Sequence, residues 1–383
     1  MSQNIFEKSQ KLNELFRDVR ILYPEFVPEK LPHRNKEIDE LVYAFEPVLK
    51  GRKPLNVVLL GGTGTGKTVT AKYVLKELEE YSDRAKSLYI NCFEFNSRPA
   101  VLTAIANFLG QAVPRRGLAT DETYSKVLEA LKKINFVPLI ILDEVDQLLQ
   151  KQEGSSLLYD LLRVIEFGKA HIGIILISND FAFSSRLEQR VKSSLAQHTI
   201  TFEQYSPLQL KDILRERVQF AFLPGKLEEE VINVSAAHAA KKGGDARIAI
   251  DCLLKAGRVA EQKNSSKVTL QHLKEVLASI GASQAQKALP FLNQNEKAVI
   301  EAISKSPEGI CSGDLFKKYK TLSKNPLTQR QFRSILSKFE KMKILRAEEV
   351  AKKKRGRTRK IFLCSSKEAL KELLAQAEQK TSN

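Results

Sequence analysis

The sequence predicts an α/β domain with a parallel sheet flanked by helices, followed by an all-helical domain and a small basic C-terminal domain. Three observations lead to this fold class. Apolar strand patterns alternate with helical patterns from residue 56 to 202, which is typical of a mostly parallel sheet. The pattern from 207 to 280 is wholly helical, and the pattern from 290 onward combines three helices with a hairpin. With 383 residues, the chain is long enough for two or three domains.

These changes of pattern predict five segments. They are an N-terminal arm (1–22), an α/β domain (23–206), an all-helical domain (207–280), a linker (281–289) and a basic domain (290–383). We expect the arm to be helical because its apolar residues would share one helix face, and we expect the linker because its composition is rich in Ala, Gln and Ser. The apolar residues of the arm are Leu12, Leu15, Phe16 and Val19.

The composition argues against several classes of protein. No apolar run approaches the roughly 20 residues of a membrane span, and the polar first residues do not resemble an export signal. The four cysteines lie far apart without a Cys-x-x-Cys pair, and the five histidines show no ligand-like spacing. We therefore expect a protein of the reducing cytoplasm with neither a disulfide framework nor a zinc site.

A glycine-rich loop follows the first strand pattern. The strand covers 56–60, the loop reads GGTGTGKT from Gly61 to Thr68, and a helical pattern follows from 69 to 78. Glycines let successive backbone N–H groups curl around an anion, and the helix adds the positive end of its dipole. This order of strand, loop and helix predicts a phosphate-binding loop for ATP or ADP, against the alternative of an ordinary turn. The expected ligands are Gly64, Thr65, Gly66, Lys67 and Thr68.

Two side chains of the loop have separate expected roles. Lys67 would reach the β and γ phosphates, and the Thr68 hydroxyl would take one position on Mg²⁺. The segment just upstream of such a loop commonly supplies the wall against which adenine packs. In this chain the wall would consist of Val27, Pro28 and Arg34.

Two further strand patterns end in polar residues that suit ATP hydrolysis. The run 137–142 ends in Asp143 and Glu144, and the run 172–177 is soon followed by Asn179. Asp143 would organise Mg²⁺ through its waters, Glu144 would polarise the attacking water, and Asn179 would hold that water or the γ phosphate. The doublet of carboxylates favours a hydrolase over a P-loop kinase. The alternative is an Asp that merely caps a helix.

Basic residues mark three other places in the first two domains. The turn-rich loop 113–117 carries Arg115 and Arg116, which would either touch phosphates or lie in solvent. A basic helix is expected over 186–195. In the all-helical domain, Asp245 is the expected N-cap of a helix whose first turns carry Arg247, an arginine able to point back at a nucleotide.

Most of the net charge of +17 belongs to the C-terminal domain. From 290 to 364 the chain has 19 Lys and Arg residues against 7 Asp and Glu residues. A domain with such a positive charge is typical of proteins that bind a polyanion, and nucleic acid is the first candidate. The alternative is that the charge serves solubility alone.

The C-terminal domain has the layout of a winged helix-turn-helix. Its third helix, 328–342, has one apolar face and begins with a capping box formed by Thr328 and Gln331. The polar face would enter the major groove with Arg330, Arg333 and Lys338. The hairpin tip 352–360 has seven basic residues in nine, including Arg355, Arg357 and Arg359, and suits backbone or minor-groove contacts. The alternative is a protein-binding winged helix with a solvated charge run.

Several longer motifs give the chain a resemblance to a known family. They are VPRRGL (113–118), RVKSSL (190–195), TFEQYSPLQLKDILRER (201–217) and GGDARIAID (243–251), and they accompany the loop GGTGTGKT and the strand ending ILDEVD. Over essentially its whole length, the chain resembles archaeal replication initiators of the origin-recognition and cell-division-cycle family. These are AAA+ P-loop ATPases with an all-α lid and a C-terminal winged-helix domain.

The resemblance implies roles that spacing alone could not show. Asn179 matches the sensor 1 residue, and Arg247 matches sensor 2 in the lid. Tyr205 and Arg217 match positions that contact the nucleotide, and Arg190 matches the finger that reaches the γ phosphate of a neighbouring subunit. Arg115 and Arg116 fall in the region through which the ATPase domain of such initiators grips DNA.

The function implied is ATP-dependent, site-specific binding of double-stranded origin DNA at the nucleoid. Weak, slow ATP hydrolysis would act as a conformational switch, and the protein would help to recruit the replicative helicase. Paralogous initiators would be further partners. One alternative is a winged-helix transcription regulator that holds ADP. A clamp-loader-like enzyme is a weaker alternative because it would not need a basic wing.

Overall fold

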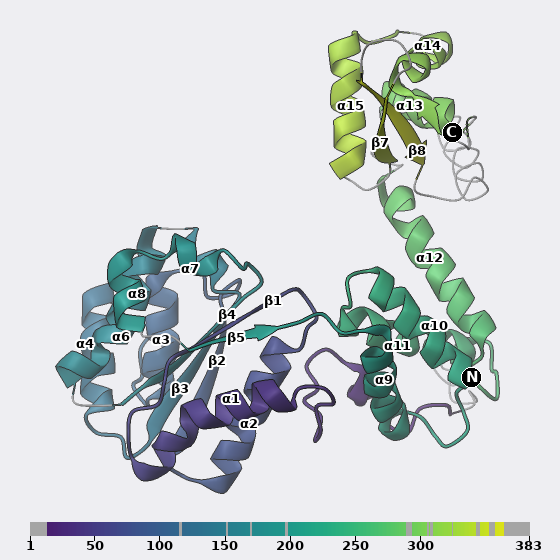
Figure 1. The fold of residues 1–383 in the computed structure, drawn as a ribbon. Helices are drawn as coiled ribbons and strands as arrows, with labels where there is room; N and C mark the ends of the chain where they lie inside the picture. Colours follow the sequence, from purple (N-terminus) through teal and green to yellow (C-terminus); the bar gives the residue numbers. More distant parts are fainter. Residues whose placement is uncertain are drawn as a thin grey trace, which may run out of the picture. The chain divides into compact units, whose positions relative to one another are not determined.

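The computed structural model divides the chain into two compact units, Met1–Leu270 and Gln271–Asn383 (Figure 1). The structure describes residues 14–114, 117–150, 152–168, 171–195, 198–288, 293–304, 306, 309–323, 325–341, 345–351 and 357–363. Each unit has hydrophobic clusters of its own.

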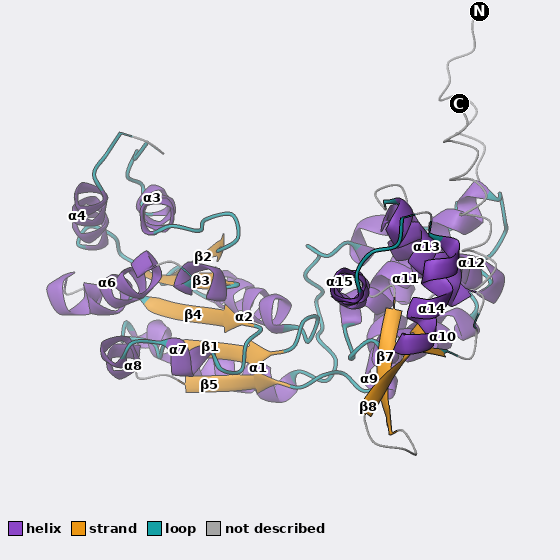
Figure 2. Ribbon diagram, turned by 90° about the horizontal axis from the view of Figure 1, so that it is seen from above, coloured by secondary structure: helices purple, strands orange, loops and turns teal. Residues whose placement is uncertain are grey.

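The first unit contains a five-stranded sheet with the strand order β2-β3-β4-β1-β5 (Figures 1 and 2). All neighbouring strands are parallel, which confirms the sheet expected from the alternating pattern. β1, β3 and β4 are buried along their whole length, as parallel strands with both faces covered should be. The strands are β1 (Val57–Gly61), β2 (Ala85–Asn91), β3 (Val137–Asp143), β4 (Gly173–Ser178) and β5 (His198–Phe202).

Helices cover both faces of this sheet (Figure 2). Successive residues of a strand point to opposite faces, so Val57 and Leu59 of β1 pack with α1 and α2, whereas Val58 and Leu60 pack with α3, α4, α6 and α8. The helices and 3₁₀ turns are α1 (Asn35–Phe45), η3 (Glu46–Lys50), α2 (Lys67–Tyr81), α3 (Arg98–Phe108), α4 (Thr120–Leu131), α5 (Asp146–Leu149), α6 (Gln152–Gly168), α7 (Phe183–Arg186) and α8 (Gln189–Leu195).

The basic helix expected over 186–195 is present over 189–195 as α8, but it does not begin at Arg186, which ends the separate helix α7. Leu187 lies between the two helices with extended backbone (ψ 140°). Its side chain is buried in the hydrophobic cluster between the sheet and the helices α3, α4, α6 and α8. Burial of this leucine turns the chain and ends α7.

Three further helices form the all-helical part of the first unit. They are α9 (Pro207–Ala221), α10 (Glu229–Lys241) and α11 (Ala246–Gln262). Ser206 and Gln209 form a reciprocal capping box at the start of α9. Asp245 caps α11 as predicted, since its carboxylate accepts a hydrogen bond from the backbone N–H of Arg247 at 2.9 Å.

The linker expected over 281–289 is wrong for most of its length. The helix α12 runs without a break from Leu270 to Ala288 (Figure 1). Ala and Gln are good helix formers, and the first proline of this stretch is Pro290. The composition that suggested a linker therefore continues a helix.

The N-terminal segment packs with the all-helical part of the first unit. A helix over the arm is wrong for the described residues, where helical structure begins only with the 3₁₀ turn η2 (Val19–Leu22); Leu12 lies outside them. Phe16 forms an antiparallel bridge with Phe222, and Leu223 N–H donates to the Leu15 carbonyl at 3.0 Å. Because these backbone groups pair with the end of α9, they are not available for a helix.

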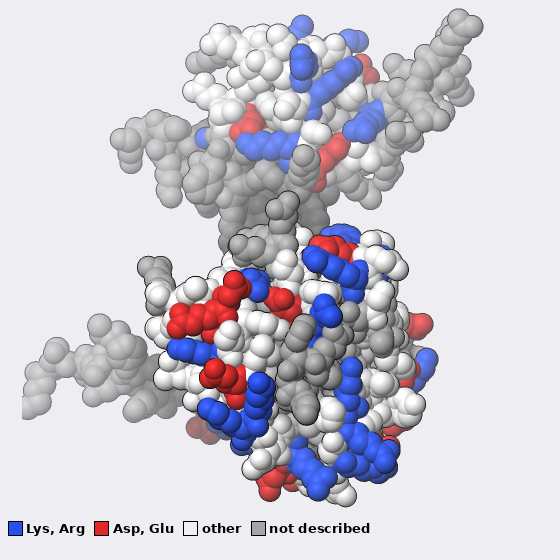
Figure 3. All heavy atoms as spheres, turned by 90° about the vertical axis from the view of Figure 1, so that its left-hand side faces the viewer, with Lys and Arg blue, Asp and Glu red and all other residues white. Residues whose placement is uncertain are grey.

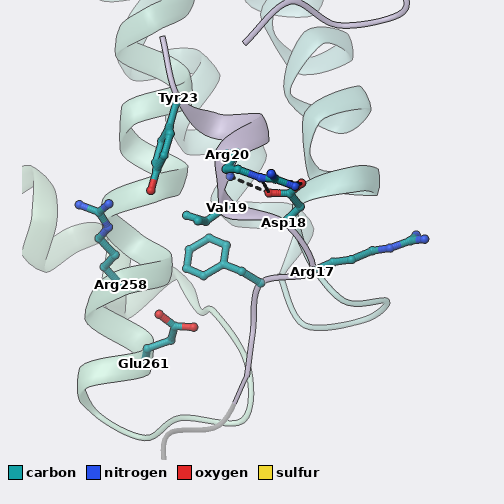
Figure 4. A pocket seen from close by; sticks show the side chains of 8 residues that line it. Arg17, Asp18, Val19, Arg20, Tyr23, Arg258 and Glu261 are labelled. Carbon is teal, nitrogen blue, oxygen red and sulfur yellow. Dashed lines mark hydrogen bonds and ion pairs between the residues drawn. The ribbon is translucent and has the colours of Figure 1, made fainter. Parts of the chain in front are cut away.

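A pocket of about 480 Å³ lies between this segment and α11 (Figure 4). Arg20 and Asp18 face each other across 2.8 Å on one side of it, and Arg258 and Glu261 project from α11 on the other. The lining residues are Phe16, Arg17, Asp18, Val19, Arg20, Tyr23, Arg258 and Glu261.

The second unit has the winged-helix layout that the sequence predicts. Beyond α12, three helices pack on an antiparallel sheet with the strand order β6-β8-β7, in which the short strand β6 was not predicted. The elements are α13 (Gln294–Ser304), β6 (Ile310–Cys311), α14 (Ser312–Leu322), α15 (Gln329–Lys341), β7 (Leu345–Ala351) and β8 (Arg357–Leu363). The sequence also predicts a short C-terminal helix over 367–377, and these residues lie outside the described ones.

The amphipathic character predicted for α15 is confirmed. Its apolar face, with Phe332, Ile335, Leu336 and Phe339, is buried in the core of the second unit. Thr328 N–H donates to Gln331 Oε1 at 3.1 Å, and Gln331 N–H donates to Thr328 Oγ1 at 3.4 Å, so the capping box is present. Among the described helices, none combines the length and the apolarity that a membrane span requires.

We predict that Leu15→Ala lowers the free energy of unfolding by about 2 to 5 kcal/mol. The Leu15 side chain is fully buried, so its loss leaves a cavity beside α9. Leu208→Ala, at a side chain 71% exposed on α9 itself, should change the free energy by less than about 0.5 kcal/mol. Urea unfolding followed by circular dichroism measures both, and equal effects would show that the N-terminal segment does not stabilise this part of the fold.

Candidate functional site

The loop between β1 and α2 has the shape of an anion cradle. Gly64 (φ 68°) and Gly66 (φ 94°) adopt left-handed backbone conformations that side chains disfavour. Gly66 precedes the first residue of α2, a 15-residue helix that has no side-chain cap at its N-terminus. The free N–H groups of this helix end and the turn of the loop together suit a phosphate.

Lys67 lies at the centre of this cradle with its side chain buried. Its Nζ donates to the carbonyls of Gly61 at 2.8 Å and Gly62 at 2.7 Å, and to Asn179 Oδ1 at 2.8 Å. Burial lowers the pKa of Lys67 to about 8, although Asp143 and Glu144 oppose this change. The ammonium group is therefore held by neutral acceptors, and an anionic ligand would be a better partner.

Asp143 and Thr68 are brought together as the sequence predicts. Thr68 Oγ1 donates to Asp143 Oδ2 at 2.7 Å, and the backbone N–H of Glu144 donates to Asp143 Oδ1 at 2.9 Å. The parallel register places the carboxyl ends of β3, β4 and β1 at one edge of the sheet, which explains the meeting of distant residues. A hydroxyl and a buried carboxylate at this distance fit the oxygen ligands that Mg²⁺ prefers.

Asn179 connects the lysine with the second carboxylate. Its Nδ2 donates to both carboxylate oxygens of Glu144, at 2.9 and 2.8 Å, while its Oδ1 accepts from Lys67. Glu144 has a left-handed backbone conformation (φ 54°), which is rare for a side chain of this kind and is typical of functional positions. Lys67, Asn179 and Glu144 thus form one hydrogen-bonded chain, and their roles toward a γ phosphate and its attacking water stay predictions.

Arg34 holds the backbone of the glycine-rich loop at Thr65. Its buried guanidinium donates to the Thr65 carbonyl through Nε at 3.0 Å and through Nη2 at 2.7 Å. It also pairs with Glu37 at 2.8 Å and lies 4.0 Å from the centre of the Tyr205 ring. These contacts hold the backbone of the phosphate loop. A role in an adenine wall, together with the half-buried Val27 and the buried Pro28, stays a prediction.

Tyr205 and Arg217 make different contacts, although each affects the pKa of the other. The Tyr205 hydroxyl lies 2.7 Å from the position that a Cβ on Gly66 would take, so this ring borders the loop, and burial raises its pKa. Arg217 instead donates to the Ile21 carbonyl at 3.0 Å, and its guanidinium lies 4.9 Å from the Phe26 ring. Burial lowers the pKa of Arg217. Both nucleotide contacts stay predictions, and the structure adds a link from Arg217 to the N-terminal segment.

The all-helical part of the unit touches the loop at the start of α11. A Cβ on Gly64 would lie 1.7 Å from Asp245 Oδ1, and the Ala246 N–H donates to the Gly64 carbonyl at 3.2 Å. The Arg247 guanidinium lies 3.3 Å from the Asp245 carboxylate, and its positive charge opposes protonation of Lys67. Arg247 is thus beside the loop as predicted. The contact of Asp245 with Gly64 has no signal in the sequence.

Arg190 is not brought to the phosphate loop of its own chain by any of its described contacts. Its Nε pairs with Glu188 at 2.7 Å, and its guanidinium lies 4.9 Å from the Tyr159 ring. The side chain is 53% exposed, so it is available on the surface of α8. Action on a neighbouring subunit stays a prediction.

The basic residues predicted to contact DNA are only partly described. Arg330 and Arg333 are exposed on α15, whereas Lys338 pairs with the buried Glu296 at 2.7 Å. Arg359 of β8 lies 3.7 Å from Glu340. Lys and Arg side chains are spread over the face of the second unit that Figure 3 shows. Arg357 begins β8, and Arg115, Arg116 and Arg355 lie outside the described residues.

Three family descriptions match successive parts of the chain. Residues 51–187 match the AAA domain, 211–278 the Cdc6 AAA+ ATPase-type lid domain, and 292–373 the CDC6 C-terminal winged helix domain. The ORC1-type DNA replication protein of Thermococcus kodakarensis is 36% identical over 98% of this chain and 94% of its own length. The ORC1-type DNA replication protein 1 of Archaeoglobus fulgidus is 34% identical over 97% of this chain and 94% of its own.

The chain belongs to the family of ORC1-type DNA replication proteins. Among solved structures, that of the Aeropyrum pernix ORC1 protein in complex with DNA matches this ORC1-type chain with a TM-score of 0.70 at 33% identity. The match covers 94% of this chain and 97% of that one. The family and the fold class predicted from the sequence are confirmed. The protein is a DNA replication initiator with an AAA+ ATPase domain, a lid and a winged helix.

We predict that nucleotide binding to this ORC1-type protein at pH 8 takes up about half a proton. Lys67 is half protonated there because burial lowers its pKa to about 8, and an anionic phosphate restores the charged form. Calorimetric titrations in buffers of different ionisation enthalpy measure this uptake. Lys67→Arg provides the control, since an arginine stays charged and should take up no proton. Wild-type binding without proton uptake would contradict the assignment of Lys67.

A second prediction concerns the contact between lid and loop. Gly64→Ala should lower nucleotide affinity by at least tenfold, about 1.4 kcal/mol, because the new Cβ collides with Asp245. Gly225→Ala is the matched control: it has a similar φ of 73° and open space around the new Cβ, so it carries backbone strain alone. Fluorescence titration with a nucleotide analogue measures both. If Gly64→Ala/Asp245→Ser binds no better than Gly64→Ala, the collision is not the cause.

Proposed function

We propose that this chain binds duplex DNA at replication origins through its winged helix, under the control of ATP bound to its AAA+ domain. The observation that carries the DNA contact is the division of α15 into two faces. Phe332, Ile335 and Phe339 are buried in the core, while Arg330 and Arg333 stay exposed. A helix with such a basic face suits the major groove. The DNA complex of the Aeropyrum pernix ORC1 protein supports the proposal.

Other basic residues would add contacts that do not read the base sequence. Arg355, Arg357 and Arg359 in the β7–β8 hairpin suit the DNA backbone or a minor groove. Arg115 and Arg116 would let the AAA+ domain contact DNA separately from the winged helix. Lys338 would reach DNA only by exchanging its ion pair with Glu296.

The nucleotide would bind at the glycine-rich loop. Its phosphates would meet the N–H groups from Gly64 to Thr68 and replace the neutral acceptors of Lys67. Tyr205, Arg217, Val27 and Pro28 would surround the rest of the nucleotide. Thr68 and Asp143 are the protein groups that fit Mg²⁺, which when bound neutralises charge on the phosphates.

The hydrolysis that we propose is slow. Both carboxylate oxygens of Glu144 accept hydrogen bonds from Asn179, so Glu144 must exchange these bonds before it can polarise a water molecule. Arg247, which belongs to the lid, would contact the γ phosphate, so the position of the lid would depend on whether that phosphate is present. Arg190, exposed on α8, would reach the nucleotide of a neighbouring copy or a paralogue. The cycle would then act as a switch on DNA that helps to recruit the replicative helicase.

Selection of genomic DNA tests the proposed function. Sheared genomic DNA is incubated with the protein at physiological salt with ATP or ADP, and the retained fragments are sequenced. We predict recovery of a few discrete loci that include a replication start. Arg333→Ala should weaken binding to these loci by roughly 1 to 3 kcal/mol and relax the sequence preference. Lys317→Ala, at an exposed position on α14, is the control and should keep that preference.

Uniform recovery of the genome would mean that the winged helix grips phosphates without reading bases. Recovery of promoters alone, with no replication start among them, would favour a transcription regulator that holds ADP. Equal behaviour of the two variants would show that α15 is not the recognition helix.

A further inference from the structure

Tyr89 lies beside the candidate magnesium-binding carboxylate, and no step proposed so far uses it. Its strand, β2, forms one edge of the sheet and pairs with β3, with Tyr89 opposite Ile141. From this position the Tyr89 hydroxyl donates a hydrogen bond to Asp143 Oδ2 at 3.0 Å. The contact joins the edge strand to the carboxylate at the end of β3.

Three donors fix the two oxygens of this carboxylate. Oδ2 accepts from Tyr89 and from Thr68 Oγ1 at 2.7 Å, and Oδ1 accepts from the backbone N–H of Glu144 at 2.9 Å. The Thr68 hydroxyl is the group that would itself bind Mg²⁺. If Thr68 turned to such an ion, Tyr89 would still donate to Oδ2 of Asp143, as the described contacts of this carboxylate stand.

The tyrosine is itself held in place. Lys72 Nζ lies 3.5 Å from the centre of the Tyr89 ring, and Lys72 stands one turn after Thr68 on α2. A phenol hydroxyl is a hydrogen-bond donor at neutral pH, so Tyr89 can hold a carboxylate oxygen of Asp143.

We propose that Tyr89 is a positioning residue for the magnesium site. Its hydroxyl holds Asp143 in the orientation in which this carboxylate and the Thr68 hydroxyl can share one Mg²⁺ ion with the phosphates of a nucleotide. The inference rests on the proposed function, because it takes Asp143 and Thr68 as the protein groups nearest to the ion. Loss of such an outer partner typically costs roughly ten- to a hundredfold in metal affinity.

Tyr89→Phe tests this role because it removes the hydroxyl and keeps the ring that Lys72 covers. The Mg²⁺ concentration for half-maximal binding of a fluorescent ATP analogue should rise about tenfold. Binding of the analogue in EDTA should stay unchanged, since the Tyr89 hydroxyl has no described contact with the phosphate loop. Tyr81→Phe, at a side chain 80% exposed at the end of α2, is the matched control and should leave the Mg²⁺ midpoint where it is.

An unchanged Mg²⁺ midpoint in Tyr89→Phe, with clear Mg²⁺ dependence in the wild type, would overturn the inference alone. An equal loss of affinity with and without Mg²⁺ would also overturn it, because it would mean general damage to the fold. If the affinity of the wild-type protein for the analogue did not depend on Mg²⁺, the proposed role of Asp143 and Thr68 would be contradicted. The inference about Tyr89 would then be overturned as well.

Discussion

The buried ammonium group of Lys67 connects the strand ends from which the site is built. It contacts the Gly61 carbonyl at the end of β1 and Asn179 after β4, and Asn179 in turn contacts Glu144 after β3. A buried charge is costly unless it is well hydrogen-bonded, and this one has only neutral direct acceptors. Burial therefore lowers the pKa of Lys67, because it disfavours the charged form. The arrangement therefore favours an anionic phosphate, which supplies the missing opposite charge.

The loop around Lys67 is held from two directions. Arg34 binds the Thr65 carbonyl on one side, and the start of α11 contacts Gly64 on the other through Asp245 and the Ala246 N–H. The space beside Gly64 has no room for a Cβ. We expect a change in the loop on nucleotide binding to alter the position of the lid, because the two share a close backbone contact. The proposed nucleotide switch would require a coupling of this kind.

In the second unit, one basic residue of α15 takes part in an ion pair with a buried carboxylate, and two others are exposed to solvent. Lys338 is tied to Glu296, a carboxylate only 5% exposed, whereas Arg330 and Arg333 on the same helix are exposed. Removal of Lys338 would leave a buried carboxylate without its partner, so its loss would affect the fold as well as any ligand. The charge of α15 is thus not one uniform surface, although its residues look equivalent in the sequence.

The sequence alone determined the parallel sheet, the phosphate loop, the partners Asp143 and Glu144, the caps Asp245 and Thr328, and the amphipathic α15. Each of these follows from local patterns: periodicity, turn chemistry and the rule that parallel strands end at one edge. Where a local pattern competed with burial or pairing, it was wrong. Leu187 ended α7 because its side chain entered the core, and residues 15–18 paired with the end of α9 and the two residues after it instead of forming a helix.

Only the tertiary structure decided which side chains meet across the sheet and the lid. The contacts of Tyr89 with Asp143, Asp245 with Gly64 and Arg34 with Thr65 join residues 31 to 181 positions apart. No local pattern encodes such a pair, because the distance between its members is set by strand order, register and helix packing. The residue types of the site could therefore be read from the sequence, whereas their mutual support depends on the folded chain.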